Sequence, residues 1–205
     1  MGIAGNVRGS GREERNDMYL YIIKFFIIII SILPFYLLIR RPWKRIGKRE
    51  WVLGAFMLYM AGLLVLVLEG QYGDPAWMIR SATERIAAWE GISLEPFRTI
   101  CTNFRHFIPD VFTVNIIGNI VMFVPWGFGL PYLWERMRSL TALVFAFLVL
   151  PLCIETCQLF IGRSVDIDDV ILNFLGSGLG AGVFYGLWCL PWGRKRFANK
   201  KFTNH

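Results

Sequence analysis

The stretch Leu140–Ile161, LTALVFAFLVLPLCIETCQLFI, decides the class of fold. A helix needs roughly 20 mostly apolar residues to cross the hydrocarbon core of a bilayer, and this run has that length. Its one charged residue, Glu155, lies near the C-terminal end of the run. The stretch therefore predicts a membrane-spanning helix.

Four more apolar runs of similar length surround this one, and they lie at about residues 19–39, 51–68, 111–134 and 169–192. Only 18% of all residues are charged, whereas a soluble domain usually carries about a quarter. A cleavable signal peptide is the alternative for the first run. That run is too long for one, however, and it ends at Arg40-Arg41, which is a stop-transfer pattern.

These runs predict an all-α integral membrane protein built as a five-helix transmembrane bundle. The bundle forms one domain over residues 18–192. A disordered arm, residues 1–17, precedes it, and a basic tail, residues 193–205, follows it.

Basic residues are distributed unevenly between the two sides of this bundle. The first and third connections and the C-terminal tail together carry 13 Lys and Arg against two acids. The N-terminal arm and the second and fourth connections carry eight against 12 acids. Because Lys and Arg are enriched in cytoplasmic loops, we expect the N-terminus outside and the C-terminus in the cytoplasm.

The second connection, residues 69–110, is the long outer loop in this topology. Within it, Pro75–Trp89 has apolar residues at helical spacing on one face. That pattern predicts a short interfacial helix lying at the level of the outer headgroups. The alternative is a partly buried lid packed over the helix ends. In either case we expect residues 92–108 to fold back over the outer mouth of the bundle.

Polar side chains inside a span are costly to bury, so their positions carry information about function. Asn115 and Asn119 share a face of the third run, and Glu155 and Gln158 share a face of the fourth. In the expected topology both pairs and the start of the fifth run lie in the outer leaflet. We therefore predict a polar pocket there. Its residues are Asn115, Asn119, Glu155, Gln158, Arg163, Asp166, Asp168, Asp169 and Asn173.

Structural roles compete with this interpretation. Asparagines can hydrogen-bond neighbouring helices, and Asp166 or Asp168 can cap the fifth helix. Arg163 can simply neutralise a nearby carboxylate. For Glu155 a functional role is the default, because a carboxylate within a span is rarely kept for structure alone.

Glycines recur along the fifth run at a spacing that lets helices approach closely. We expect this helix to pack against the third and fourth helices through them. The glycines are Gly176, Gly178, Gly180, Gly182 and Gly186.

Several of these motifs resemble the VanZ-like family, which is named for a small membrane protein associated with teicoplanin resistance. Order and spacing agree with the family over about residues 92–182. The matching pieces are Leu94–Arg98, Asn115–Asn119, Phe123–Gly127, Glu155–Gln158, Arg163, Asp166–Asn173 and Gly176. Glu95 departs from the family, which more often has an apolar residue there. The resemblance implies a role in the bacterial plasma membrane and, in some members, glycopeptide tolerance, without an established reaction.

Two functions fit these features best. The first is a non-enzymatic protein that binds an amphiphile, either a lipoglycopeptide antibiotic or a lipid-linked envelope precursor, with Arg163 on an anionic headgroup. The alternative is an enzyme acting on a polyprenyl-linked or lipid substrate, with Glu155 as general acid or base. In that case Asp166, Asp168 and Asp169 could hold Mg²⁺; otherwise we expect no metal or cofactor. An accessory or structural subunit is a third interpretation.

The expected partners are membrane lipids rather than nucleic acid. A nucleic-acid-binding protein spreads its basic residues over a polar face, whereas here they bracket apolar runs. The sequence does not determine the oligomeric state.

Overall fold

The computed structural model describes residues 48–68 and 74–190. The predicted span at residues 19–39, the N-terminal arm and the basic tail lie outside these residues. The chain divides into two compact units, residues 1–69 and residues 70–205. In the first unit the described structure is a single helix, α2 (Lys48–Val67).

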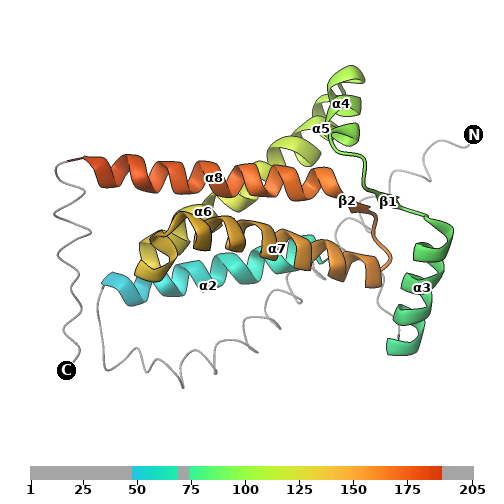
Figure 1. Cartoon of the computed structure of the whole chain (residues 1–205), viewed down its shortest axis with the longest axis horizontal. Helices are drawn as coiled ribbons and strands as arrows, with labels where there is room; N and C mark the ends of the chain where they lie inside the picture. The colour runs from blue at the N-terminus through green and yellow to red at the C-terminus, as the bar shows by residue number, and fades with distance from the viewer. Residues whose placement is uncertain (1–47, 69–73, 191–205) are drawn as a thin grey trace, which may run out of the picture. The chain divides into compact units, whose positions relative to one another are not determined.

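The second unit is almost entirely helical (Figure 1). Its elements, in chain order, are α3 (Pro75–Ala88), β1 (Ile92–Ser93), α4 (Arg98–Arg105), α5 (Pro109–Phe112), the π-helical η2 (Thr113–Gly118), α6 (Asn119–Leu133), the 3-10 helix η3 (Glu135–Arg138), α7 (Leu140–Phe160), β2 (Val165–Asp166) and α8 (Ile167–Cys189).

Four of the five predicted spans are confirmed as helices long and apolar enough to cross a membrane. They are Arg49–Val67, Pro109–Leu133, Leu140–Phe160 and Ile167–Cys189. The second of these begins slightly before its predicted start, because α5 and η2 run into α6 as one continuous helix. The all-α class is confirmed for the described residues, while the count of five and the orientation stay predictions.

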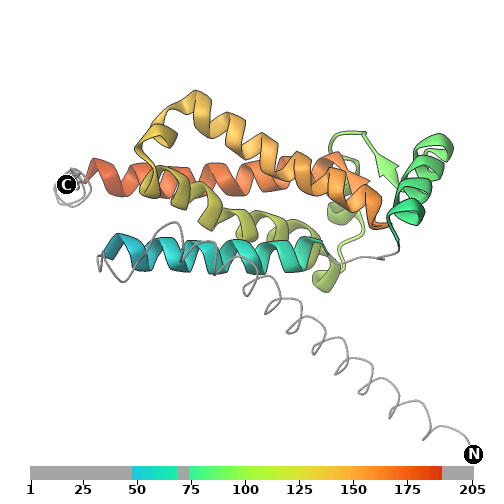
Figure 2. The same ribbon diagram turned by 90° about the horizontal axis from the view of Figure 1, so that it is seen from below.

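Helices α6, α7 and α8 run side by side, and α8 contacts both of the others (Figures 1 and 2). The approach of α6 to α8 is so close that only glycine fits. A Cβ atom built at Gly176 would overlap the carbonyl oxygen of Ile120, and one at Gly180 would overlap that of Val124. On α6, Gly127 meets the backbone of Ser177 in the same way.

The other three glycines predicted to pack lie on a different face of α8. A Cβ atom at Gly178, Gly182 or Gly186 would meet nothing within 4 Å in the described part of the chain. Residues two apart on an α-helix are separated by about 200° around its axis, so this row points away from α6. The structure therefore corrects the prediction, and Gly176 and Gly180 form the packing row.

The second connection reaches the bundle at two places. Helix α3 begins at the N-cap Asp74, whose side chain accepts a hydrogen bond from Trp77 N (2.8 Å). Its Arg85 donates to the carbonyl of Leu159 (3.3 Å), which ties α3 to the end of α7. The predicted helix over Pro75–Trp89 is thus confirmed, and its contact with a membrane interface stays a prediction.

The second place is a parallel pairing of β1 with β2, which joins Ile92 to Val165 and Ser93 to Asp166. This pairing holds the loop before α4 against the turn between α7 and α8. The expectation that residues 92–108 fold back onto the bundle is confirmed for the start of that segment.

Candidate functional site

The polar residues gather where α6 begins, α7 ends and α8 begins, which we call the polar end of the unit. Glu155 lies in the last turns of α7 and is only 4% exposed. Its Oε2 accepts a hydrogen bond from the backbone N–H of Asp166 (3.0 Å). A buried carboxylate costs free energy unless it is hydrogen-bonded, and this contact offsets part of that cost.

Asp166 is the N-cap of α8. Its Oδ1 accepts from Asp168 N (3.0 Å), and its Oδ2 accepts from the hydroxyl of Thr99 (2.5 Å). Aspartate is among the favoured residues at this position, because its oxygen satisfies a backbone N–H that the helix leaves unpaired. The structural role considered for Asp166 is therefore confirmed.

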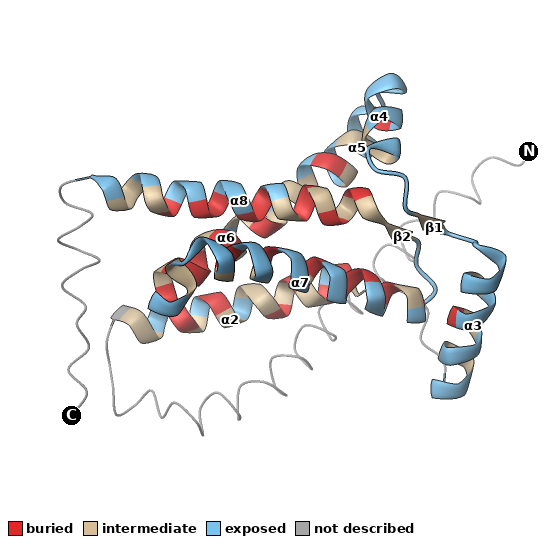
Figure 3. Ribbon diagram, in the orientation of Figure 1, coloured by how far each residue is buried: buried red, intermediate tan, exposed pale blue. Residues whose placement is uncertain are grey.

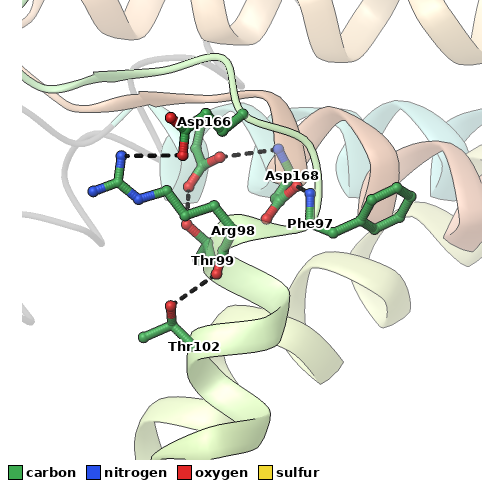
Figure 4. A network of polar contacts seen from close by, with 7 residues as sticks. Phe97, Arg98, Thr99, Thr102, Asp166 and Asp168 are labelled. Atoms are coloured by element: carbon green, nitrogen blue, oxygen red, sulfur yellow. Dashed lines mark hydrogen bonds and ion pairs between the residues drawn. The ribbon is translucent and has the colours of Figure 1, made fainter.

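Asp168 is fully buried, and both of its oxygens are used by the segment around α4 (Figure 4). One accepts from Phe97 N (2.5 Å) and the other from Ile100 N (3.0 Å). These are the amides at the start of α4, where the N-cap Phe97 has a positive φ of 67° and no side-chain cap of its own. Asp168 thus caps α4 from another helix. We had expected it to line a pocket.

Asp169 faces α6 instead. Its Oδ1 accepts from the side-chain amide of Asn119 (2.7 Å), which also donates to the carbonyl of Asn115 (3.0 Å). The structure thus brings Asn115, Asn119 and Asp169 together, although Asn115 contributes its backbone oxygen. The helix is π-helical over Thr113–Gly118, immediately before Asn119. Such π-bulges are frequent at functional sites.

Asn173 lies one turn further along α8 and is 3% exposed. Its backbone carbonyl accepts from the hydroxyl of Ser177 (2.8 Å), but its side-chain Oδ1 is buried without a hydrogen-bond partner. Leaving a buried acceptor unpaired costs about 1–3 kcal/mol. The hydroxyl of Ser93, next to the Asp166 strand pair, is buried without a partner as well. Such orphaned atoms call for an explanation, and an unmodelled binding partner is one of the usual ones.

Arg163 and Gln158 belong to the turn between α7 and α8. Gln158 is buried, and its carbonyl accepts from Arg163 N (3.0 Å). The Arg163 side chain is exposed, and its positive charge attracts the carboxylates of Glu155 and Asp169. The turn therefore carries a cation beside two acids.

A metal site has no assembled set of ligands in the described residues, where no group of three or more His, Cys, Asp or Glu side chains could hold an ion. The oxygens of Asp166 and Asp168 already accept hydrogen bonds from Thr99 and from backbone N–H groups. An Mg²⁺ ion shared by Asp166 and Asp169 would thus have few protein ligands.

We call Asn119, Glu155, Asp169 and Asn173 the polar cluster, since these side chains are not committed to capping a helix. Sequence reasoning found all four. It missed Thr99 and the amides of Phe97 and Ile100, because nothing in the pattern of a loop indicates which distant side chain its backbone meets. It also missed Ser93, whose burial depends on the pairing of β1 with β2.

Comparison with known proteins gives one match. The model of the VanZ/LLP1 family matches residues 53–189, which is more than half of the chain and includes α2 as well as every element of the polar end. No curated protein and no solved structure matches. Together with the four apolar helices, this match makes the chain a multi-pass membrane protein that belongs to the VanZ/LLP1 family.

Proposed function

We propose that this protein binds an amphiphile at the polar cluster, in the outer leaflet of the bacterial plasma membrane, and thereby contributes to glycopeptide tolerance. The observation that carries the proposal is the buried, unpartnered Oδ1 of Asn173. It lies one turn from Asp169, in a region that already buries the carboxylate of Glu155. A ligand that donates a hydrogen bond to Asn173 would remove the cost of the orphaned acceptor.

The chemistry of the cluster restricts the ligand. Glu155, Asp169 and Asn173 present acceptor oxygens, which favour hydroxyl or amide donors. Arg163 adds a cation that can pair with a phosphate or carboxylate. Apolar side chains exposed along α8, such as Leu175 and Leu179, offer a surface for an acyl or polyprenyl chain. A lipoglycopeptide and a lipid-linked envelope precursor each supply sugars, an anionic group and a chain.

The orientation in this proposal follows from the distribution of charge. The turn after α7 is acidic, whereas the connection at the opposite end of the bundle carries Arg136 and Arg138. The positive-inside rule then assigns the polar end to the exterior.

Binding of teicoplanin by the full-length protein in nanodiscs tests the proposal, with a glycopeptide lacking an acyl chain as comparison. We expect Arg163→Lys to weaken teicoplanin binding about tenfold, because lysine offers a point charge instead of a bidentate contact. Arg80→Lys on the exposed side of α3 is the matched control. If wild-type protein binds neither compound, or if Arg163→Lys and Arg80→Lys behave alike, an amphiphile at this cluster is the wrong ligand or the wrong place.

An enzyme acting on a lipid-linked substrate is the second candidate, and the burial of Glu155 favours it. A carboxylate within a membrane span is a functional candidate by default, and a carboxyl group can serve as a general acid or base. Glu155→Gln keeps the shape of the side chain but removes proton transfer. An enzyme would lose turnover of a polyprenyl-phosphate substrate while still binding it. A binding protein would keep most of its affinity and the tolerance it confers.

A further inference from the structure

Helix α4 is amphipathic, but its orientation is the reverse of the one expected for a helix on a soluble domain. Its single buried residue is the polar Asn103, whose amide donates to the carbonyl of Thr99 (2.8 Å). The hydroxyl of Thr99 in turn bonds Asp166. On the outward side, Phe104 is 61% exposed, and Phe97 is also more than half exposed. α4 therefore turns polar side chains toward the protein and apolar ones away from it.

The capping contacts fix this orientation. Asp168 holds the amides of Phe97 and Ile100, and Asp166 holds the hydroxyl of Thr99, so three bonds anchor the start of α4 (Figure 4). Rotating α4 to bury Phe104 would break these bonds and leave the fully buried Asp168 without its partners. The exposure of the aromatic side is thus built into the fold rather than a result of loose packing.

The exposed apolar side continues beyond α4. We call Phe97, Phe104, Phe107, Ile108 and Val111 the aromatic stripe, and all five are exposed (Figure 3). Phe104 and Phe107 each contact the ring of Phe112, with centroids 5.1 and 5.2 Å apart. The stripe is therefore continuous and leads directly into the spanning helix Pro109–Leu133.

On that spanning helix the exposed apolar residues follow the same face. Val114, Ile117 and Val121 are exposed at intervals of three and four residues, which places them in one row along the helix. In a membrane-spanning helix such a row faces the lipid. The aromatic stripe extends this lipid-facing row past the end of the span.

Basic side chains border the stripe. Arg98 and Arg105 are exposed on α4. Arg98 lies 3.7 Å from Glu95, but both side chains are largely exposed, and such a pair contributes little. An apolar helix face bordered by arginines is the pattern of a helix lying in the headgroup region, with its apolar side among the acyl chains.

We propose that α4 and the aromatic stripe dock onto the protein's own bilayer, as a helix lying in the membrane interface at the polar end. Phe104 and Phe107 insert among the upper acyl chains, and Arg98 and Arg105 lie at the level of the phosphates. This role differs from the interfacial role expected for α3, whose Arg85 instead ties it to the end of α7. It does not depend on which ligand the polar cluster binds.

A fluorophore that senses lipid tests the proposal on the full-length chain. The four cysteines are first replaced by serine, and a single cysteine is then introduced by Phe104→Cys or by Thr102→Cys and labelled with NBD. Thr102 is exposed and lies two residues, hence about 200° around the helix, from Phe104. The protein is reconstituted into vesicles of phosphatidylcholine and phosphatidylglycerol at about 3:1, with or without a doxyl-labelled phosphatidylcholine.

We expect doxyl lipid to quench the label at position 104 at least about twofold more than the label at position 102, with a blue-shifted emission at 104. Phe107→Cys serves as a second reporter on the stripe if Phe104→Cys folds poorly. Equal quenching at the stripe and at position 102 would overturn the proposal. A blue-shifted label at 104 that doxyl lipid does not quench would also overturn it, since a protein surface would then cover the stripe.

Discussion

The two ends of the α6–α8 unit handle polar groups in opposite ways. At the end where α6 and α7 are joined, the core is apolar and consists of Leu130, Leu143, Phe147 and Ala181. Its one arginine near this core, Arg138, is well accommodated. The guanidinium donates to the carbonyl of Pro131 (3.0 Å) and lies 4.6 Å from the Trp188 ring, and the Arg138 carbonyl accepts from Tyr185 (2.7 Å).

The polar end, by contrast, buries Glu155 and Asp168 and leaves the Oδ1 of Asn173 unpaired. Both ends lie on the same three helices and are of similar age in the folding of the chain's core, so packing alone does not account for the difference. One end is built for stability, whereas the other keeps groups that lower stability. Natural proteins keep such groups mainly at functional sites.

The largest effect is expected for Asp168→Ala at the polar end. The substitution would leave the amides of Phe97 and Ile100 without an acceptor. We expect the free energy of unfolding, measured by SDS titration in mixed micelles, to fall by about 3 kcal/mol or more. Glu95→Ala in the same segment is the control, and its exposed ion pair should contribute less than about 0.5 kcal/mol. Similar losses for the two variants would mean that Asp168 does not hold α4.

The contact between the ends comes next, because α6 and α8 meet through glycine. Gly180→Ala should lower the free energy of unfolding by about 1–3 kcal/mol, since a methyl group would overlap the Val124 carbonyl. Gly182→Ala should instead be neutral or stabilising by up to about 1 kcal/mol, because alanine favours the helix and meets open space. The same unfolding titration compares the two variants. A loss at Gly182 as large as that at Gly180 would contradict the assigned packing face.

The glycines also illustrate how far the sequence could predict this structure. Apolar length was sufficient for four helices, because a bilayer imposes it. The spacing of glycines indicated close packing but favoured the row of three at 178, 182 and 186. Which face meets a neighbour depends on the shape of α6, where Gly127 provides the matching gap, and a one-helix pattern does not contain that information.

The polar end was predicted in part for a similar reason. Helix periodicity and topology brought Asn119, Glu155, Asp169 and Asn173 to one depth, and the hydrogen bonds link Asn119 with Asp169. The same reasoning treated Asp168 as equivalent to Asp169. Their different roles arise from the loop before α4, whose backbone supplies donors that no side-chain pattern indicates.

At the apolar end, Arg138→Met should have a moderate effect. The variant keeps the length of the side chain but loses the bond to Pro131 and the cation–π contact with Trp188. We expect a loss of about 1–2 kcal/mol in the same titration. Arg136→Met, at an exposed position in the same 3-10 helix, should change stability by less than about 0.5 kcal/mol. A neutral Arg138→Met would show that this end does not depend on the arginine.

The smallest effect on stability is expected for Asn173→Leu, and its sign distinguishes the two ends. Removing an unpaired buried acceptor should leave the free energy of unfolding unchanged or raise it by up to about 1 kcal/mol. Ser177→Ala, which removes the hydroxyl bonded to the Asn173 carbonyl, is the neighbouring control and should cost about 1 kcal/mol. A clear loss of stability in Asn173→Leu would mean that its amide has a structural role.

Teicoplanin binding by Asn173→Leu in nanodiscs tests the central claim most directly, because the polar end is proposed to keep this costly acceptor for a ligand. If the claim is correct, the variant binds about tenfold more weakly than the wild type while remaining at least as stable. Unchanged teicoplanin affinity in a fully stable Asn173→Leu protein would contradict it.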